Sequence, residues 1–254
     1  FLGRFLMIRN LSLIGDGLAH VSFGGIAVGI VLGSTGPLSF ALAFSIVAAV
    51  SIYEMQTREI LTGDAAIAIF LTGMLALGLV VLRIWGGGIQ ADIEGYLFGN
   101  LLLIDEESFD IICFISIIAL FLLTVLKSAL LVTSVDPLAA RVQGIPVRPL
   151  GLIFSIITAS VVVSMVQVVG TLLVTALLVT PAATAHLVGT SFRSTLMWTQ
   201  FFGFISVILG LYFSAELETG SGSMIALVAA LIFGLVATIQ QFVRKVISPG
   251  DNVN

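Results

Sequence analysis

The sequence predicts an all-α fold, a polytopic bundle of transmembrane helices, and three observations support this class. The chain of 254 residues is 59% hydrophobic and only 9% charged, with a mean hydropathy of +1.21. Such a composition leaves too little polar surface to cover a water-soluble globule. Apolar stretches of about 20 residues, the length that crosses a bilayer, recur along the chain, and basic residues cluster in alternate connections. We therefore expect a single transmembrane domain over residues 1–254.

Eight apolar stretches are candidate spans. They cover residues 10–33, 37–53, 64–84, 108–127, 149–168, 170–188, 195–214 and 223–243. A Gly-Ser-Thr-Gly-Pro turn at 33–37 joins the first two, and small residues on both, such as Gly24, Gly25 and Ala41, favour close helix packing there. The pair 149–168 and 170–188 is almost continuous apolar sequence, so one long helix kinked at Gly170 is an alternative to two spans.

Basic residues predict the orientation of these spans, because Lys and Arg accumulate in cytoplasmic loops. With a cytoplasmic N-terminus and eight crossings, nine of the ten Lys and Arg residues fall inside and Arg83 alone falls outside. A single helix over 149–188 would instead place Arg193 outside. The long connection 85–110 then lies outside, and its amphipathic segment 93–100 predicts a short helix or re-entrant piece.

One pair of ionisable side chains stands inside a candidate span. Asp16 and His20 are four residues apart, so they share one face of the first predicted helix. A carboxylate inside a membrane costs a few kcal/mol, and a carboxylate oxygen beside an imidazole nitrogen suits a divalent metal ion. The structural alternative is that Asp16 caps the helix and His20 bonds a neighbour. Two ligands do not complete a metal site, so the others would be further residues, water or backbone carbonyls.

A short helix is predicted in the cytoplasmic loop at about 136–144. Asp136 is a suitable N-cap, Pro137 fits the first helical position, and Gly144 followed by Pro146 ends the helix. A self-contained helix between two membrane spans is suited to dock into a groove on a soluble partner. The alternative is an ordinary surface helix in a loop.

The segment from Val168 to His186 combines a glycine, several threonines and a proline. Pro181 is expected to break the helix near its cytoplasmic end, and Thr175, Thr180 and Thr184 could bond the carbonyls that it frees. His186 is expected at the interface, solvated and not a ligand.

The sequence lacks the features of an enzyme. It has no Gly-x-x-x-x-Gly-Lys-Ser/Thr loop, no soluble domain, and no nucleophile with a plausible base. Any ATP hydrolysis that drives this chain must therefore come from another subunit.

In this order the motifs resemble the membrane permeases of bacterial ABC importers for manganese, zinc and iron, over almost the whole chain. Residues 12–20 are similar to the family's Gly-Asp-Ala-x-x-His signature, with Gly17 in place of the usual alanine. Residues 96–100 are similar to its Leu-Phe-Gly element, residues 136–147 to its coupling helix, and residues 169–185 to its most recognisable block.

The resemblance implies a multi-pass protein of the bacterial plasma membrane, in which two permease copies enclose a pathway. It implies Asp16 and His20 as ligands of the transported metal, no covalently bound cofactor, and no nucleic-acid partner. Two copies of a cytoplasmic ATPase subunit and an extracellular metal-binding protein would be partners, and a further helix would precede Phe1. The ATPase-coupling residues would be Asp136, Pro137, Leu138, Ala139, Ala140, Arg141 and Gly144.

Manganese is the favoured cargo, because the candidate pair contains no thiolate; zinc or iron is the alternative within the same family. A proton-coupled secondary metal transporter, with Asp16 and His20 as the proton relay, is the alternative from another class. It would be supported by inverted repeats, which the sequence does not display. A third alternative, a purely structural subunit, predicts that alanine at both positions leaves transport intact.

Overall fold

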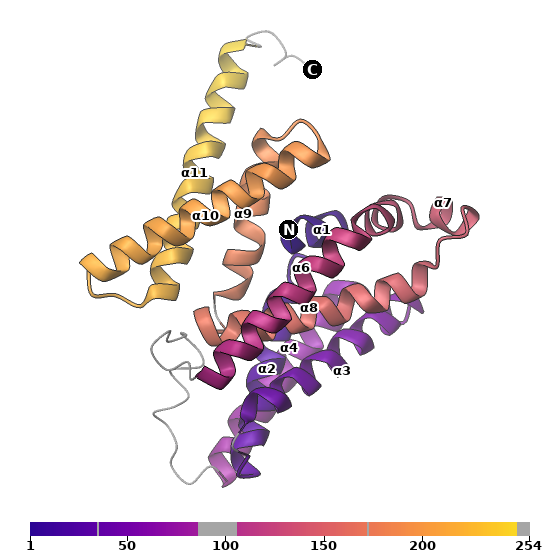
Figure 1. Cartoon of the computed structure of the whole chain (residues 1–254), viewed down its shortest axis with the longest axis vertical. Helices are drawn as coiled ribbons and strands as arrows, with labels where there is room; N and C mark the ends of the chain where they lie inside the picture. The colour runs from indigo at the N-terminus through magenta and orange to yellow at the C-terminus, as the bar shows by residue number, and fades with distance from the viewer. Residues whose placement is uncertain (35, 86–105, 172, 248–254) are drawn as a thin grey trace.

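The computed structural model describes residues 1–34, 36–85, 106–171 and 173–247, apart from the side chains of 107, 108 and 243–247. These residues form helices and connections, without a strand among them (Figure 1). The helices are α1 (Leu2–Ile8), α2 (Ile14–Val31), α3 (Pro37–Thr57), α4 (Gly63–Trp85), α6 (Glu106–Val135), α7 (Pro137–Val142), α8 (Val147–Val169), α9 (Val174–Val188), α10 (Phe192–Glu216) and α11 (Ser221–Ile247). The predicted helix at 93–100 lies outside the described residues.

The predicted transmembrane class is confirmed, with seven membrane-length apolar helices in the described part of the chain where about eight spans were expected. The difference is α9, which has 15 residues and is shorter than the roughly 20 needed to span a bilayer. The chain does not form one long helix over α8 and α9, which was the alternative to two spans. Gly170 interrupts it with φ +86° and ψ 162°, a conformation that ends α8 after Val169.

Two predicted helix ends were wrong, because polar or ring-containing residues are tolerated inside membrane helices. Pro181 lies inside α9 and does not end it. The Thr184 hydroxyl bonds the Thr180 carbonyl at 2.8 Å, which is not the Leu177 carbonyl that the proline frees, so this bond does not meet the expectation for the threonines. The span predicted to end at Lys127 continues as α6 to Val135. The Lys127 side chain is exposed, so its long stem can carry the ammonium group toward the interface.

Helix α2 is the most enclosed membrane-length helix and packs between α3 and α4. Glycines allow the close approach: a Cβ atom added at Gly25 would lie 2.8 Å from the Phe40 carbonyl oxygen of α3, and one at Gly24 would lie 2.8 Å from the Met74 carbonyl oxygen of α4. Close packing at small residues, predicted for the first two spans, is confirmed. The candidate pair therefore stands on a helix held on two sides.

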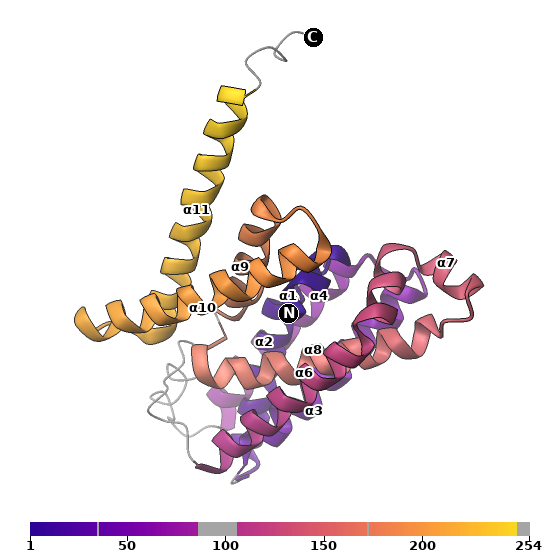
Figure 2. The same cartoon turned by 45° about the horizontal axis from the view of Figure 1, so that its top comes forward.

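The remaining helices are arranged around this core. Helix α8 lies against both α3 and α6, whereas α9, α10 and α11 form a second group beside them (Figures 1 and 2). The short α1 lies between the two groups and contacts both α6 and α9. Its Arg4 Nη1 atom is 3.2 Å from His186 Nδ1 near the end of α9, which ties the end of α9 to the N-terminal segment. His186 is exposed, as expected.

Candidate functional site

The structure brings Asp16 and His20 together on the first turns of α2. Asp16 Oδ1 and His20 Nε2 are 3.8 Å apart, which is longer than a hydrogen bond and leaves both atoms free to face one ligand. Asp16 does not cap the helix, because the N-cap position belongs to Leu13 and carries no side-chain cap bond. The helix-capping alternative for Asp16 is therefore not observed.

Burial gives this pair a direction of access. Only 9% of the His20 side chain is exposed, whereas 33% of the Asp16 side chain is exposed. Asp16 is the one residue between Ile14 and Ala27 that is not buried. A ligand would thus reach the pair at the carboxylate, with the imidazole behind it.

His20 Nδ1 is buried and has no hydrogen-bond partner within the described structure. A buried polar atom without a hydrogen-bond partner lowers the stability of the folded protein by about 1–3 kcal/mol. Such atoms are rare in native proteins and often mark a functional site or a bound water or ion. Three others belong to the break between α8 and α9: Gln167 Oε1, Thr171 Oγ1 and Thr175 Oγ1. Together the four are all but one of the orphaned side-chain atoms in the part of the chain that the structure describes.

Thr175 places this break against the first turn of α2. Its Oγ1 atom lies 3.3 Å from the position that a Cβ atom on Gly15 would take, next to Asp16 in sequence. Thr175 was expected to bond a freed carbonyl, but its hydroxyl is without a partner, so that expectation is not met. Sequence reasoning also missed Gln167 and Thr171. The available signal was a polar side chain on either side of the Gly170 break inside an otherwise apolar run.

The arrangement can hold a divalent cation only with help from weak oxygen ligands. No group of three or more His, Cys, Asp or Glu side chains suited to a metal occurs among the described residues. The pair supplies one carboxylate oxygen and one nitrogen, and hydroxyl, amide, carbonyl or water oxygens must supply the rest. Such a set suits Mn²⁺ and other hard or borderline ions.

The predicted short helix is present as α7, and its start is built as expected. The Asp136 Oδ1 atom accepts hydrogen bonds from the backbone N–H groups of Leu138 (3.0 Å) and Ala139 (2.9 Å), with Pro137 in the first turn. Gly144 follows the helix with φ +76°. Ala140 is buried and anchors α7 to the bundle, while Leu138 and Val142 are 72% and 88% exposed. α7 therefore presents apolar side chains outward.

The sequence matches a known protein family over most of its length. The family model described as "ABC 3 transport family" matches residues 1–240. The chain belongs to the ABC 3 transport family. It is a multi-pass protein of the bacterial plasma membrane.

Proteins of known name are similar to this chain over most of their length. The manganese transport system membrane protein MntC of Listeria innocua is 33% identical, with 91% of this chain and 82% of that protein covered. The manganese import system permease protein ScaB of Streptococcus gordonii is 31% identical (96% and 87% covered). The zinc uptake membrane protein ZnuB of Haemophilus influenzae is 30% identical (92% and 89% covered).

A solved structure shares the fold. PsaBC from Streptococcus pneumoniae, determined in complex with a Fab, has a chain with a TM-score of 0.80 and 32% identity; 92% of this chain and 84% of that one are covered. The arrangement of helices that places Asp16 and His20 on an enclosed α2 thus belongs to an ABC 3 permease fold.

Proposed function

We propose that this ABC 3 family member is the permease subunit of an ABC importer that carries Mn²⁺ into the cytoplasm. The observation that carries the proposal is the Asp16–His20 pair on α2, which is enclosed on the histidine side and open at the carboxylate. Relatives named as manganese permeases support the cargo. The relative named for zinc makes Zn²⁺ the alternative cargo, and Fe²⁺ is a further one.

The chemistry of the pair suits passage of an ion. A hydrated Mn²⁺ ion would exchange waters for the Asp16 carboxylate first, since that group is the accessible one, and then for His20 Nε2. Thr175 Oγ1, which lies 3.3 Å from the position of a Cβ atom on Gly15, is a hydroxyl oxygen of the α8–α9 break that could supply a weak ligand. Two strong ligands and several weak ones bind an ion loosely enough to release it.

Selectivity for manganese over zinc cannot come from affinity alone, because Zn²⁺ binds nitrogen and oxygen ligands more tightly than Mn²⁺ does. A site with one carboxylate, one imidazole and neutral oxygens favours the higher coordination numbers of the harder ion. The absence of a thiolate in the pair agrees with this choice. Delivery of the ion by an extracellular metal-binding protein, which we infer as a partner, would add a second step of selection.

We further infer that two ATPase subunits hold α7 of two permease copies. Support comes from the exposed apolar side chains of Leu138 and Val142 on a short helix with a strong N-cap. Apolar groups on a projecting helix fit a groove on a partner. ATP hydrolysis in those subunits, rather than a proton gradient, would then drive transport, and the same pair would bind metal rather than relay protons.

The test is metal uptake by proteoliposomes that contain this chain with its ATPase and binding protein. We expect Asp16→Asn and His20→Ala each to reduce ATP-dependent Mn²⁺ uptake at least tenfold, because each removes a strong ligand. Asp64→Asn and His186→Ala are the matched controls, since both residues are exposed and lie outside the pair. Full uptake in both pair variants would make the pair structural and refute the proposal, and a preference for Zn²⁺ would replace the cargo.

A further inference from the structure

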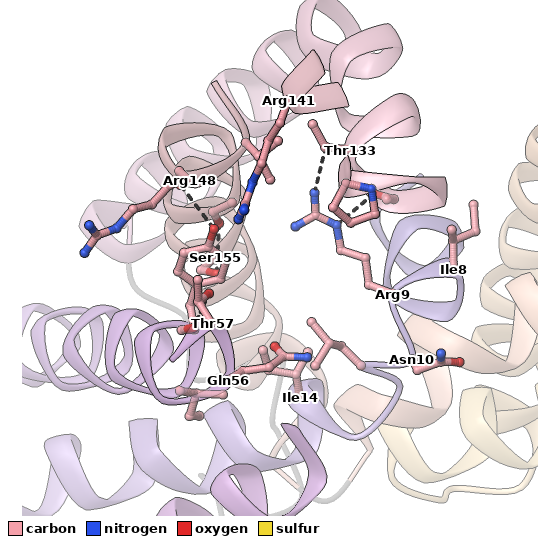
Figure 3. A pocket seen from close by; sticks show the side chains of 17 residues that line it. Ile8, Arg9, Asn10, Ile14, Gln56, Thr57, Thr133, Arg141, Arg148 and Ser155 are labelled. Atoms are coloured by element: carbon pink, nitrogen blue, oxygen red, sulfur yellow. Dashed lines mark hydrogen bonds between the residues drawn. The ribbon is translucent and has the colours of Figure 1, made fainter. Parts of the chain in front are cut away.

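A cavity of about 380 Å³ opens at the end of the bundle that carries α7 (Figure 3). It is lined by residues from the α1–α2 junction, the ends of α3 and α6, α7 itself and the start of α8. Its charged lining residues are all arginines, Arg9, Arg141 and Arg148, and no Asp or Glu lines it among the described residues. The cavity is thus cationic, and the metal pair on α2 plays no part in it.

Among the described residues, Arg9 is fixed in place by neutral groups. Its Nε atom donates to Ser134 Oγ at 2.8 Å and its Nη2 atom to Thr133 Oγ1 at 3.3 Å. The guanidinium carbon lies 4.4 Å from the centre of the Phe154 ring. These neighbours are all uncharged, and burial lowers the pKa of the Arg9 guanidinium from its ordinary value. A partly buried cation held only by neutral groups is incompletely compensated, so an anion beside it would be stabilised.

Arg141 and Arg148 add to the excess of positive charge in the cavity. Arg148 Nη2 binds both carboxylate oxygens of Glu54, at 2.8 and 2.9 Å, but Glu54 also accepts from Arg58 at 3.1 Å. One carboxylate therefore serves two guanidinium groups. Arg141 extends from α7 toward the space between Arg148 and Arg9 (Figure 3), where it faces no carboxylate among the residues that line the cavity.

The rest of the lining indicates the class of anion. Tyr53, Gln56 and Thr57 offer neutral hydrogen-bonding groups, while the half-buried Ile8 and Val147 provide apolar surface. Guanidinium forks match the oxygens of phosphate. The cavity lies where membrane-length helices end, which in a bilayer is the level of the lipid headgroups. With the predicted orientation it faces the cytoplasm, where basic pockets between transmembrane helices bind anionic headgroups. A small soluble anion would not need the apolar part of the lining.

We propose that this cavity binds the phosphate of an anionic phospholipid of the inner leaflet, with Arg9 and Arg141 as its principal contacts. The lipid's glycerol hydroxyl or backbone oxygens would meet Tyr53, Gln56 or Thr57, and the start of its acyl chains would meet Ile8 and Val147. Because the lining comes from α1, α3, α6, α7 and α8, the bound lipid would join the base of α7 to the helices around it.

The experiment uses the purified full chain in detergent micelles. Phosphatidylglycerol, phosphatidylcholine or inorganic phosphate is titrated in, and bound lipid is counted by native mass spectrometry while the unfolding temperature is followed by tryptophan fluorescence. We expect phosphatidylglycerol to be retained and to raise the unfolding temperature, and phosphatidylcholine and inorganic phosphate to do neither. Arg141→Gln should weaken phosphatidylglycerol binding at least tenfold, and Arg9→Gln at least as much.

The control is Arg193→Gln, which removes one exposed positive charge outside the cavity and should bind phosphatidylglycerol as the wild type does. Arg9→Gln loses the bonds to Ser134 and Thr133. If it does not fold for that reason, the result for Arg141→Gln, a change at an exposed residue, still tests the proposal. An equal response to phosphatidylcholine, or equal weakening by Arg193→Gln, would overturn the proposal. Saturation by inorganic phosphate alone would also overturn it and make the site one for a free anion.

Discussion

At the scale of single residues, Gly170 has the most restricted backbone of the positions that shape the site. Its φ of +86° with ψ of 162° is a region open essentially only to glycine. We predict that Gly170→Ala lowers the free energy of unfolding by about 1–3 kcal/mol, seen as a lower unfolding temperature in micelles. It should also reduce Mn²⁺ uptake, because the strain falls next to Thr171.

Gly73 is the matched control for this substitution. It lies inside α4, and an added Cβ would meet nothing within 4 Å. Alanine in a helix interior is favoured over glycine by roughly 0.5–1 kcal/mol, so Gly73→Ala should leave the unfolding temperature unchanged or slightly raised. A Gly170→Ala protein as stable as Gly73→Ala would mean that the α8–α9 break tolerates a side chain.

Local spacing explains how much of the candidate site could be predicted from the sequence. Asp16 and His20 could be paired because residues four apart on a helix always share a face. Gln167, Thr171 and Thr175 could not be added, because their lack of partners depends on how α8 and α9 separate at Gly170 and on the contact of Thr175 with Gly15. These features depend on tertiary packing, so they cannot be predicted from a local sequence pattern.

At the scale of elements, the departure of Gly17 from the family signature has a packing reason. A Cβ atom at Gly17 would lie 2.7 Å from Cγ2 of Ile67 on α4, a methyl group on a stiff β-branched side chain. We predict that Gly17→Ala destabilises the protein by about 1–3 kcal/mol, the usual cost of overpacking a core. The readout is the unfolding temperature in micelles, together with Mn²⁺ uptake, since Gly17 adjoins Asp16.

A double-mutant cycle with Ile67→Ala tests this explanation. Ile67→Ala alone leaves a cavity and costs stability, but in the pair it removes the methyl group that the new Cβ meets. The double variant should therefore be more stable than the sum of the two single effects predicts, by about 0.5–3 kcal/mol. Strict additivity would show that Ile67 is not what excludes alanine at Gly17.

The N-cap of α7 offers a second test at this scale. Asp136→Ala removes the acceptor for the N–H groups of Leu138 and Ala139 and should cost about 0.5–2 kcal/mol of local helix stability. Asp136→Asn retains an acceptor oxygen and is the control. We expect Asp136→Ala, but not Asp136→Asn, to lower the yield of the permease–ATPase complex in co-purification. Equal yields of the complex for both variants would contradict a role of the α7 N-cap in ATPase binding.

The helices themselves could be predicted where strong local signals bound them and not elsewhere. The Asp136–Pro137 start and Gly144 end placed α7 within two residues. Lys127 and Pro181 gave false ends, because exposure at the lipid-facing surface lets Lys127 reach outward and the packing of α9 tolerates a proline ring. The short length of α9 follows from the Gly170 break, whose sequence also allowed a kink.

At the scale of the whole molecule, the short α9 raises the question whether the predicted orientation still holds. The contacts of α9 agree with that prediction: α9 ends beside α1 through Arg4 and His186, and Gln240 of α11 bonds the Leu187 carbonyl. Both contacts return the chain to the same side of the bundle. Arg58, Arg141 and Arg148 lie together at the α7 end. Arg193 follows Phe192, whose ring packs against Phe5 of α1, as expected from the count of basic residues.

This arrangement predicts which loops face the cytoplasm. In a chain whose cysteine is removed by Cys113→Ser, we expect Thr219→Cys, in the exposed connection between α10 and α11, to react with a membrane-impermeant maleimide in intact cells. Gln143→Cys, exposed after α7, should react only after the cells are opened, because it lies at the end rich in arginine. Labelling of Gln143→Cys in intact cells would show that the orientation is the reverse of the predicted one. It would then contradict both the binding of a cytoplasmic ATPase to α7 and the binding of an inner-leaflet lipid in the arginine cavity.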